Sequence, residues 1–78
     1  MTDRETIIGI LKEIKPTIDY EKATDLATGH QLDSLDYVQL NMRLSDAFDV
    51  TITPIDMVPD NYDSVDKILK MVKTKQEE

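Results

Sequence analysis

The sequence predicts an all-α fold, a four-helix bundle with a short third helix and a long loop between the first two helices. Three segments carry apolar residues at intervals of three and four, the spacing of one face of a helix. The β-branched run at residues 50–52 has no partner strand elsewhere, so no sheet is expected. A chain of 78 residues holds one hydrophobic core. Residues 1–78 are therefore expected to form a single domain.

The first helix is expected to start after Thr2. This residue and Glu5 form a Thr-x-x-Glu capping box, in which each side chain accepts a hydrogen bond from the other residue's backbone. Pro16 ends the helix, because proline has no N–H to donate and its ring clashes with the preceding turn. The face expected to point into the core consists of Ile7, Ile10, Leu11 and Ile14.

Residues 17–33 are predicted to form a long loop, because their apolar residues follow neither a helical nor a strand period. Loops of this length are uncommon in compact domains and tend to be functional or disordered. Scattered apolar anchors indicate that this loop lies across the core. These anchors are Ile18, Leu26, Ala27 and Leu32.

A second helix is expected to start at Asp33, with Asp36 as its reciprocal cap, and to end between Asp46 and Phe48. Two apolar stripes run along it. The first suits a core face and comprises Tyr37, Leu40, Leu44 and Phe48. The second comprises Leu35, Val38 and Met42. A helix on the surface of a bundle needs only one apolar face, so packing of the core does not require this second stripe. From the pattern alone it is either additional core or an exposed surface for a partner.

The rest of the chain predicts a short helix and a long one. Thr53 and Pro54 fit the N-cap and first position of a short helix, which Pro59 is expected to end. Asp63 or Ser64 caps the last helix, and the polar residues 73–78 are expected to be a frayed tail. The core face of the last helix is expected to be Val65, Ile68, Leu69 and Val72.

The charge of the chain limits its partners. There are 9 basic and 16 acidic residues, a net charge of −7, which opposes binding to phosphate backbones, so no nucleic-acid partner is expected. Between residues 23 and 66 there are nine aspartates and a single base, Arg43. Helix capping explains part of this excess. The remainder suggests an anionic surface that attracts basic partner proteins.

The inventory of side chains argues against catalysis. The chain has no cysteine and one histidine, His30, so disulfides, thiolate metal sites and a cysteine nucleophile are excluded. A Ser-His hydrolase would need an orienting acid and a nucleophile elbow, which the sequence lacks. No apolar run is long enough to span a membrane, and the first residues do not form a signal peptide. We expect a monomeric, cytoplasmic protein that is not an enzyme and binds no metal, with His30 a solvated loop residue.

Two tetrads of the same form occur at predicted helix starts, Asp33-Ser34-Leu35-Asp36 and Asp63-Ser64-Val65-Asp66. Both have the composition of helix caps. Their contexts differ, because only the first follows a long loop and precedes the helix with two apolar stripes. Ser34 is therefore the serine expected beside an apolar surface that the core does not need.

The chain resembles an acyl carrier protein over nearly its whole length. The resemblance rests on residues 32–40, Leu-Asp-Ser-Leu-Asp-Tyr-Val-Gln-Leu, followed by Leu44, Phe48, Ile52 and the helix start at 64–65. It implies an attachment site for 4′-phosphopantetheine, supplied from coenzyme A by a phosphopantetheinyl transferase. The arm would hold acyl or aminoacyl groups as thioesters. By this resemblance the arm is attached to Ser34, and Asp33, Leu35 and Asp36 belong to its site.

The same resemblance implies a docking surface for the enzymes that load and accept these groups, which would have basic docking faces. Its partner-binding residues would be Leu35, Val38, Gln39, Met42, Asp46 and Ile52.

Departures from carriers of fatty acid synthesis favour a specialised carrier. Gln31 stands where those carriers usually have glycine, and Gln39 and Ser45 stand where they favour glutamate. The alternative is an unmodified acidic helical module that binds a basic partner, in which Ser34 is a plain N-cap.

Overall fold

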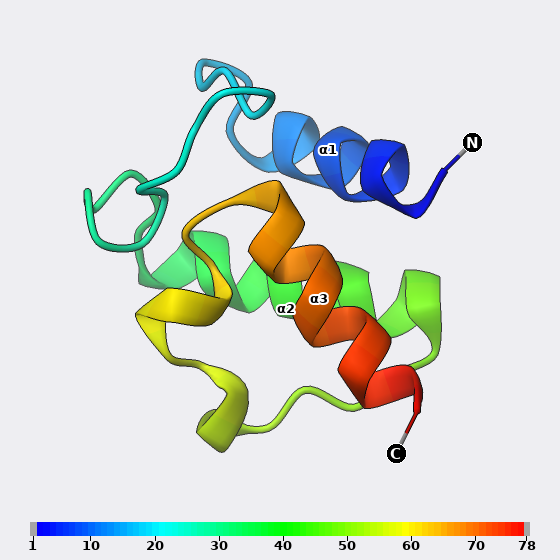
Figure 1. Cartoon of the computed structure of the whole chain (residues 1–78). Coiled ribbons are helices and arrows are strands. Elements are labelled where there is room, and N and C mark those ends of the chain that lie inside the picture. The colour runs from blue at the N-terminus through cyan, green and yellow to red at the C-terminus, as the bar shows by residue number, and fades with distance from the viewer. Residues whose placement is uncertain (1, 78) are drawn as a thin grey trace.

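The computed structural model of the chain describes residues 2–77. Three α-helices and two short 3₁₀ turns account for all the regular structure in this range, which contains no strand (Figure 1). The predicted all-α architecture, with a short element before the last helix, is confirmed. The elements are α1 (Asp3–Ile14), α2 (Ser34–Phe48), η1 (Pro54–Asp56), η2 (Pro59–Asn61) and α3 (Val65–Gln76).

The three helices pack around one core. α1 contacts both α2 and α3, and α3 also contacts η2; in Figure 1, α3 crosses in front of α2 with α1 above both. Each predicted core face contributes buried side chains, while Ile14, Tyr37, Phe48 and Leu69 are only partly buried at the edge of the core. The fully buried helix residues include Ile7, Leu11, Leu40, Leu44, Ile68 and Val72.

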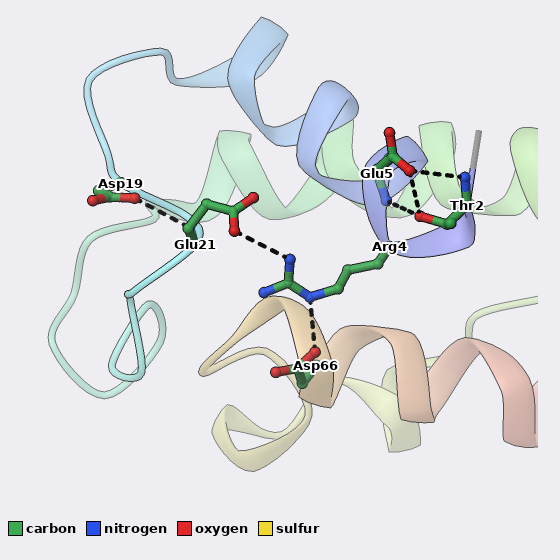
Figure 2. Close-up of polar contacts among 6 residues, drawn as sticks. All are labelled: Thr2, Arg4, Glu5, Asp19, Glu21 and Asp66. Atoms are coloured by element: carbon green, nitrogen blue, oxygen red, sulfur yellow. Dashed lines mark hydrogen bonds and ion pairs between the residues drawn. The ribbon is translucent and has the colours of Figure 1, made fainter.

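The capping box predicted for α1 is present. The Glu5 backbone N–H donates to Thr2 Oγ1 over 3.1 Å, and the Thr2 N–H donates to Glu5 Oε1 over 3.3 Å (Figure 2). Two donors that would otherwise have no partner at the helix start are thereby satisfied. At the other end α1 stops at Ile14, with Lys15 as its C-cap and Pro16 next, as predicted.

Residues 15–33 form the long connection between α1 and α2, and this loop lies across the core as predicted. Leu26 and Leu32 are buried, and Ile18 and Ala27 pack partly buried against the core. Tyr20 is an anchor that the sequence did not reveal. It is 1% exposed, and its hydroxyl donates to the Lys15 carbonyl oxygen over 2.6 Å. This contact joins the loop to the C-terminal end of α1.

Arg4 links three parts of the chain (Figure 2). Its Nε lies 3.0 Å from Asp66 Oδ1 at the start of α3, and its Nη1 lies 3.5 Å from Glu21 Oε2 in the loop. These contacts are exposed, so each contributes little to the free energy of unfolding. Their effect is positional, because they hold the middle of the loop beside the ends of two helices.

Asp63 connects the same loop to the start of α3. Its Oδ1 accepts hydrogen bonds from the backbone N–H groups of Ala27 and Thr28, at 3.0 and 2.8 Å, and its own carbonyl oxygen accepts from the Leu26 N–H at 3.0 Å. The hydrogen bond from the Thr28 N–H is the main cause that lowers the pKa of the Asp63 carboxyl below its usual value. The segment leading to α2 is therefore fixed by a charged carboxylate.

Asp63→Asn is expected to change how stability depends on pH. Because folding lowers the pKa of Asp63, its contribution is fully present above the unfolded value of about 3.8 and is lost as pH falls through the lower folded value. The wild type should therefore have a higher unfolding temperature than Asp63→Asn at pH 7, and the gap should begin to narrow as the pH falls below about 4. Thermal unfolding of both proteins from pH 7 to pH 2 tests this. A gap that stays constant over this whole range would contradict the role of the charge.

Two details differ from the sequence-based expectations. The short third helix is divided into η1 and η2. The expectation that Pro59 ends this helix is wrong, because η1 already ends at Asp56 and Pro59 is the first residue of η2, where its missing N–H is not needed. The expected frayed tail at 73–78 is helical through Gln76, and Glu78 lies outside the described residues. Ion pairs hold this last stretch, since Lys73 pairs with Asp3 and Lys75 Nζ lies 2.9 Å from Asp56 Oδ2. No helix in the described part of the chain is long and apolar enough to cross a bilayer.

Candidate functional site

Ser34 is the first residue of α2 and is exposed to solvent. The helix is capped by its neighbours: the Asp36 N–H donates to Asp33 Oδ1 over 2.9 Å, and the Asp33 N–H donates to Asp36 Oδ2 over 3.0 Å. With the cap supplied by Asp33, the Ser34 hydroxyl makes no hydrogen bond within residues 2–77. Ser34 is thus an exposed serine on a helix start that its neighbours cap.

Ser64 has a different role, although the sequence of its tetrad differs from that of the first tetrad at only one position. Here the serine itself is the N-cap, and its Oγ accepts a hydrogen bond from the Lys67 N–H over 3.1 Å. Ser64 is also partly buried. The two tetrads are thus offset by one residue relative to their helices, so that Asp33 caps α2 while Ser64 caps α3.

The charges around Ser34 are partly balanced. Lys15 Nζ, at the end of α1, lies 3.4 Å from Asp36 Oδ2 and offsets one of the two nearby carboxylates. The N-terminal N–H groups of α2 and its dipole favour an anion at this end of the helix. An exposed hydroxyl on such a turn fits a phosphodiester. Among the described residues, no group of three or more His, Cys, Asp or Glu side chains is arranged to hold a metal ion.

The second stripe of α2 is exposed. Leu35, Val38 and Met42 are 63%, 52% and 68% exposed, whereas Leu40 and Leu44 on the other stripe are fully buried. Of the two interpretations left open by the pattern, additional core is therefore wrong. These three residues, called the apolar stripe below, run along α2 from the position next to Ser34.

The other residues predicted to bind partners lie close to this stripe. Gln39 and Asp46 are exposed, and Ile52 is partly buried against the edge of the core. Asp46 and Ile52 line a shallow open depression together with Met42. Arg43, which also lines it, forms an ion pair with Glu13 of α1. The depression is thus partly apolar, with an acidic side chain at its rim.

Sequence reasoning missed a second exposed apolar group, in the connection between α2 and α3. Ile55 is 87% exposed, and Met57 and Val58 are each 45% exposed. A signal was present, because three apolar residues lie between Pro54 and Pro59. The run is too short to show a period, which is why helical or strand patterning gave no assignment for it.

Comparison with known proteins gives one match. Residues 4–72 match the family model described as "Phosphopantetheine attachment site". No curated protein and no solved structure matches the chain. The matched range extends from the first turn of α1 into α3 and includes the exposed serine at the start of α2.

Proposed function

The chain belongs to the phosphopantetheine-attachment family, and on this premise we propose that Ser34 is its attachment residue. Domains of this family are not catalytic; they carry substrates on a 4′-phosphopantetheine arm. The observation that carries the proposal is the exposed Ser34 hydroxyl, which is left free because Asp33 and Asp36 cap α2 between themselves. Ser64, the serine of the matching tetrad, is occupied as a cap.

When bound, the arm supplies a terminal thiol on which acyl groups are held as thioesters. The residues of the chain fix where that arm begins. The reciprocal Asp33 and Asp36 cap keeps the first turn of α2 ordered, so that the Ser34 oxygen points to solvent from a rigid element. Lys15 compensates part of the negative charge that a phosphodiester meets there.

We assign the apolar stripe, with Gln39, Asp46 and Ile52, to docking of partner enzymes. Three large apolar side chains that remain exposed beside Ser34 are suited to a complementary apolar patch. The net charge of −7 favours partners with a basic rim, because opposite charges speed the encounter. The transferase and the enzymes that load and unload the arm are the partners of this class. We place the carrier in the cytoplasm as a monomer, on its cysteine-free composition and single small core.

Intact mass spectrometry tests the assignment as a carrier. After incubation with coenzyme A, Mg²⁺ and a phosphopantetheinyl transferase of broad specificity, the protein should gain the mass of one phosphopantetheine group. The control is the same incubation without coenzyme A. An acidic interaction module with Ser34 as a plain helix residue would gain no mass, and that result would reject the proposal.

Charge on α2 is expected to limit which enzymes use the carrier. Asp36 and Asp46 are the only acidic residues within α2. Fatty acid synthesis enzymes that select a carrier with a glutamate-rich helix at this position should therefore use the loaded protein poorly. Gln39→Glu combined with Ser45→Glu should raise the turnover of such an enzyme at low salt. The gain should shrink in high salt, because salt screens charges separated by more than the Debye length of about 8 Å at physiological ionic strength.

Steady-state assays of both proteins with one such enzyme, at two salt concentrations, measure this effect. Gln39→Asn with Ser45→Thr is the neutral control. If the enzyme turns over the wild-type protein as fast as it turns over a carrier of fatty acid synthesis, the assignment of this chain to a specialised pathway is wrong.

A further inference from the structure

The start of α2 is acidic and receives a basic contact from another helix. Residues 23–42 contain no lysine or arginine, so the segment around Ser34 supplies no such cation of its own. It does supply two carboxylates, those of Asp33 and Asp36, which cap α2. The cation that meets them is Lys15, the C-cap of α1, whose Nζ lies 3.4 Å from Asp36 Oδ2.

This contact places the Lys15 ammonium group beside the first turn of α2. Asp36 Oδ2 accepts a hydrogen bond from Lys15 Nζ and another from the backbone N–H of Asp33, the residue directly before Ser34. One carboxylate oxygen therefore joins the lysine to the neighbour of the proposed attachment residue. The side chain of Asp36 is 14% exposed and that of Lys15 is 38% exposed. Water and salt screen a partly buried pair of this kind less than they screen a fully exposed pair.

The backbone of Lys15 is held in place, so only its side chain is free to move. Its N–H donates to the Leu11 carbonyl oxygen over 2.8 Å and closes the last turn of α1. Its own carbonyl oxygen accepts from the hydroxyl of the buried Tyr20 over 2.6 Å. The next residue is Pro16, whose ring fixes its backbone angle φ. The ammonium group thus extends from a fixed point to the start of α2.

A phosphodiester on Ser34 adds a negative charge to a turn that already carries two. Together with Asp33 and Asp36 it makes three anionic groups within four residues, and like charges at such short separations repel each other. An ammonium group has three N–H donors, and the contact with Asp36 uses one of them. Lys15 can therefore donate to a phosphate oxygen without giving up Asp36.

We propose that Lys15 is a binding residue for the phosphodiester of the arm, and that its ammonium group bridges this phosphodiester and the Asp36 carboxylate. The proposal rests on the attachment at Ser34 proposed above. It fixes the base of the arm against the end of α1. Loading then adds a contact between α1 and α2 in place of an uncompensated charge, so Lys15 stabilises the loaded protein more than the unloaded one.

A thermodynamic cycle tests the proposal. The equilibrium constant of unfolding is measured in urea for the wild type and Lys15→Gln, each before and after complete modification by a transferase with coenzyme A. Modification should raise this constant about two- to fivefold more in Lys15→Gln than in the wild type, the range that one ion pair accounts for. If Lys15 acts only at the end of α1, its loss will affect both forms equally. Lys15→Arg keeps the charge and donates to phosphate, so it should behave like the wild type.

Lys12→Gln is the matched control. Lys12 lies one turn earlier in α1, is exposed, and forms no ion pair with another described residue. Its substitution changes the net charge by the same amount as Lys15→Gln. Modification should therefore affect Lys12→Gln as it affects the wild type. An equal effect in both glutamine variants would indicate long-range charge and not a contact, and would overturn the proposal.

A second measurement uses the wild-type protein and does not depend on a variant that folds. The unloaded and loaded proteins are acetylated with a limiting amount of an activated ester, and each lysine is quantified by peptide mass spectrometry. Cleavage after Glu13 places Lys12 and Lys15 on different peptides. Acetylation of Lys15 relative to Lys12 should fall at least about twofold on loading, because an ammonium group that donates to two anions is less available for reaction.

The outcomes separate the two claims. Failure of Ser34 to accept any arm would reject the proposed function. Complete loading that changes the unfolding constant equally in the wild type and Lys15→Gln, or that leaves the acetylation of Lys15 unchanged, would reject only the binding of the phosphodiester by Lys15.

Discussion

Leu40→Ala is expected to lower the free energy of unfolding by about 2 to 5 kcal/mol, because it removes a fully buried side chain and leaves a cavity. In a domain of this size such a loss is a large part of the total stability. Met42→Ala, two residues further along the same helix, should change it by less than about 0.5 kcal/mol, because Met42 is 68% exposed. Urea unfolding of the three proteins measures both effects.

Leu40→Ala and Met42→Ala also distinguish a residue that packs in the core from a residue that docks a partner. Met42→Ala should slow modification by the transferase, or loading by a partner enzyme, although its fold is intact. Val72→Ala, which also shortens an apolar side chain but at a fully buried position in α3, should destabilise the protein without slowing modification of the molecules that remain folded. A loss of 2 kcal/mol or more for Met42→Ala would show that the stripe belongs to the core.

Ser34→Ala is expected to abolish modification completely and to leave stability within about 0.5 kcal/mol of the wild type, because Asp33 and not Ser34 caps α2. Ser64→Ala should do the reverse. The Ser64→Ala protein should be modified fully, but its free energy of unfolding should fall by about 1 kcal/mol, because the Lys67 N–H loses its capping acceptor. Intact mass and urea unfolding of the two variants give both values.

This double comparison uses each serine as the control for the other. If Ser34→Ala still acquires the arm, attachment at Ser34 is wrong. If Ser34→Ala loses as much stability as Ser64→Ala, its hydroxyl takes part in the cap, and the separation of capping from modification at α2 is wrong.

Local signals in the sequence were sufficient for the three α-helices and for the starts of the first two. The Thr2 and Asp33 boxes depend on residues three apart, and the core faces depend on a period within one helix, so both were predictable and are confirmed. The exposure of Leu35, Val38 and Met42 needed the structure. A stripe adjacent to a core face has the same pattern whether or not another element covers it.

Contacts between distant parts of the chain were beyond sequence reasoning. The sequence pattern indicates a possible helix cap at Asp63. Its carboxylate instead accepts hydrogen bonds from the backbone N–H groups of Ala27 and Thr28, more than thirty residues away. Tyr20 lies in a loop without a period, yet it is buried and closes the end of α1. The helical end of α3 likewise contacts a distant segment, because Lys75 pairs with Asp56. Each of these follows from tertiary packing, which no local pattern encodes.

Peptide mapping of the modified wild-type protein tests the attachment site most directly. The protein is incubated with transferase and coenzyme A and digested, and the fragments are sequenced by tandem mass spectrometry. Our account predicts one phosphopantetheine group, on the fragment that contains Ser34, and an unmodified fragment containing Ser64. An arm on Ser64, or no arm on either serine under conditions that modify a known carrier, would contradict it.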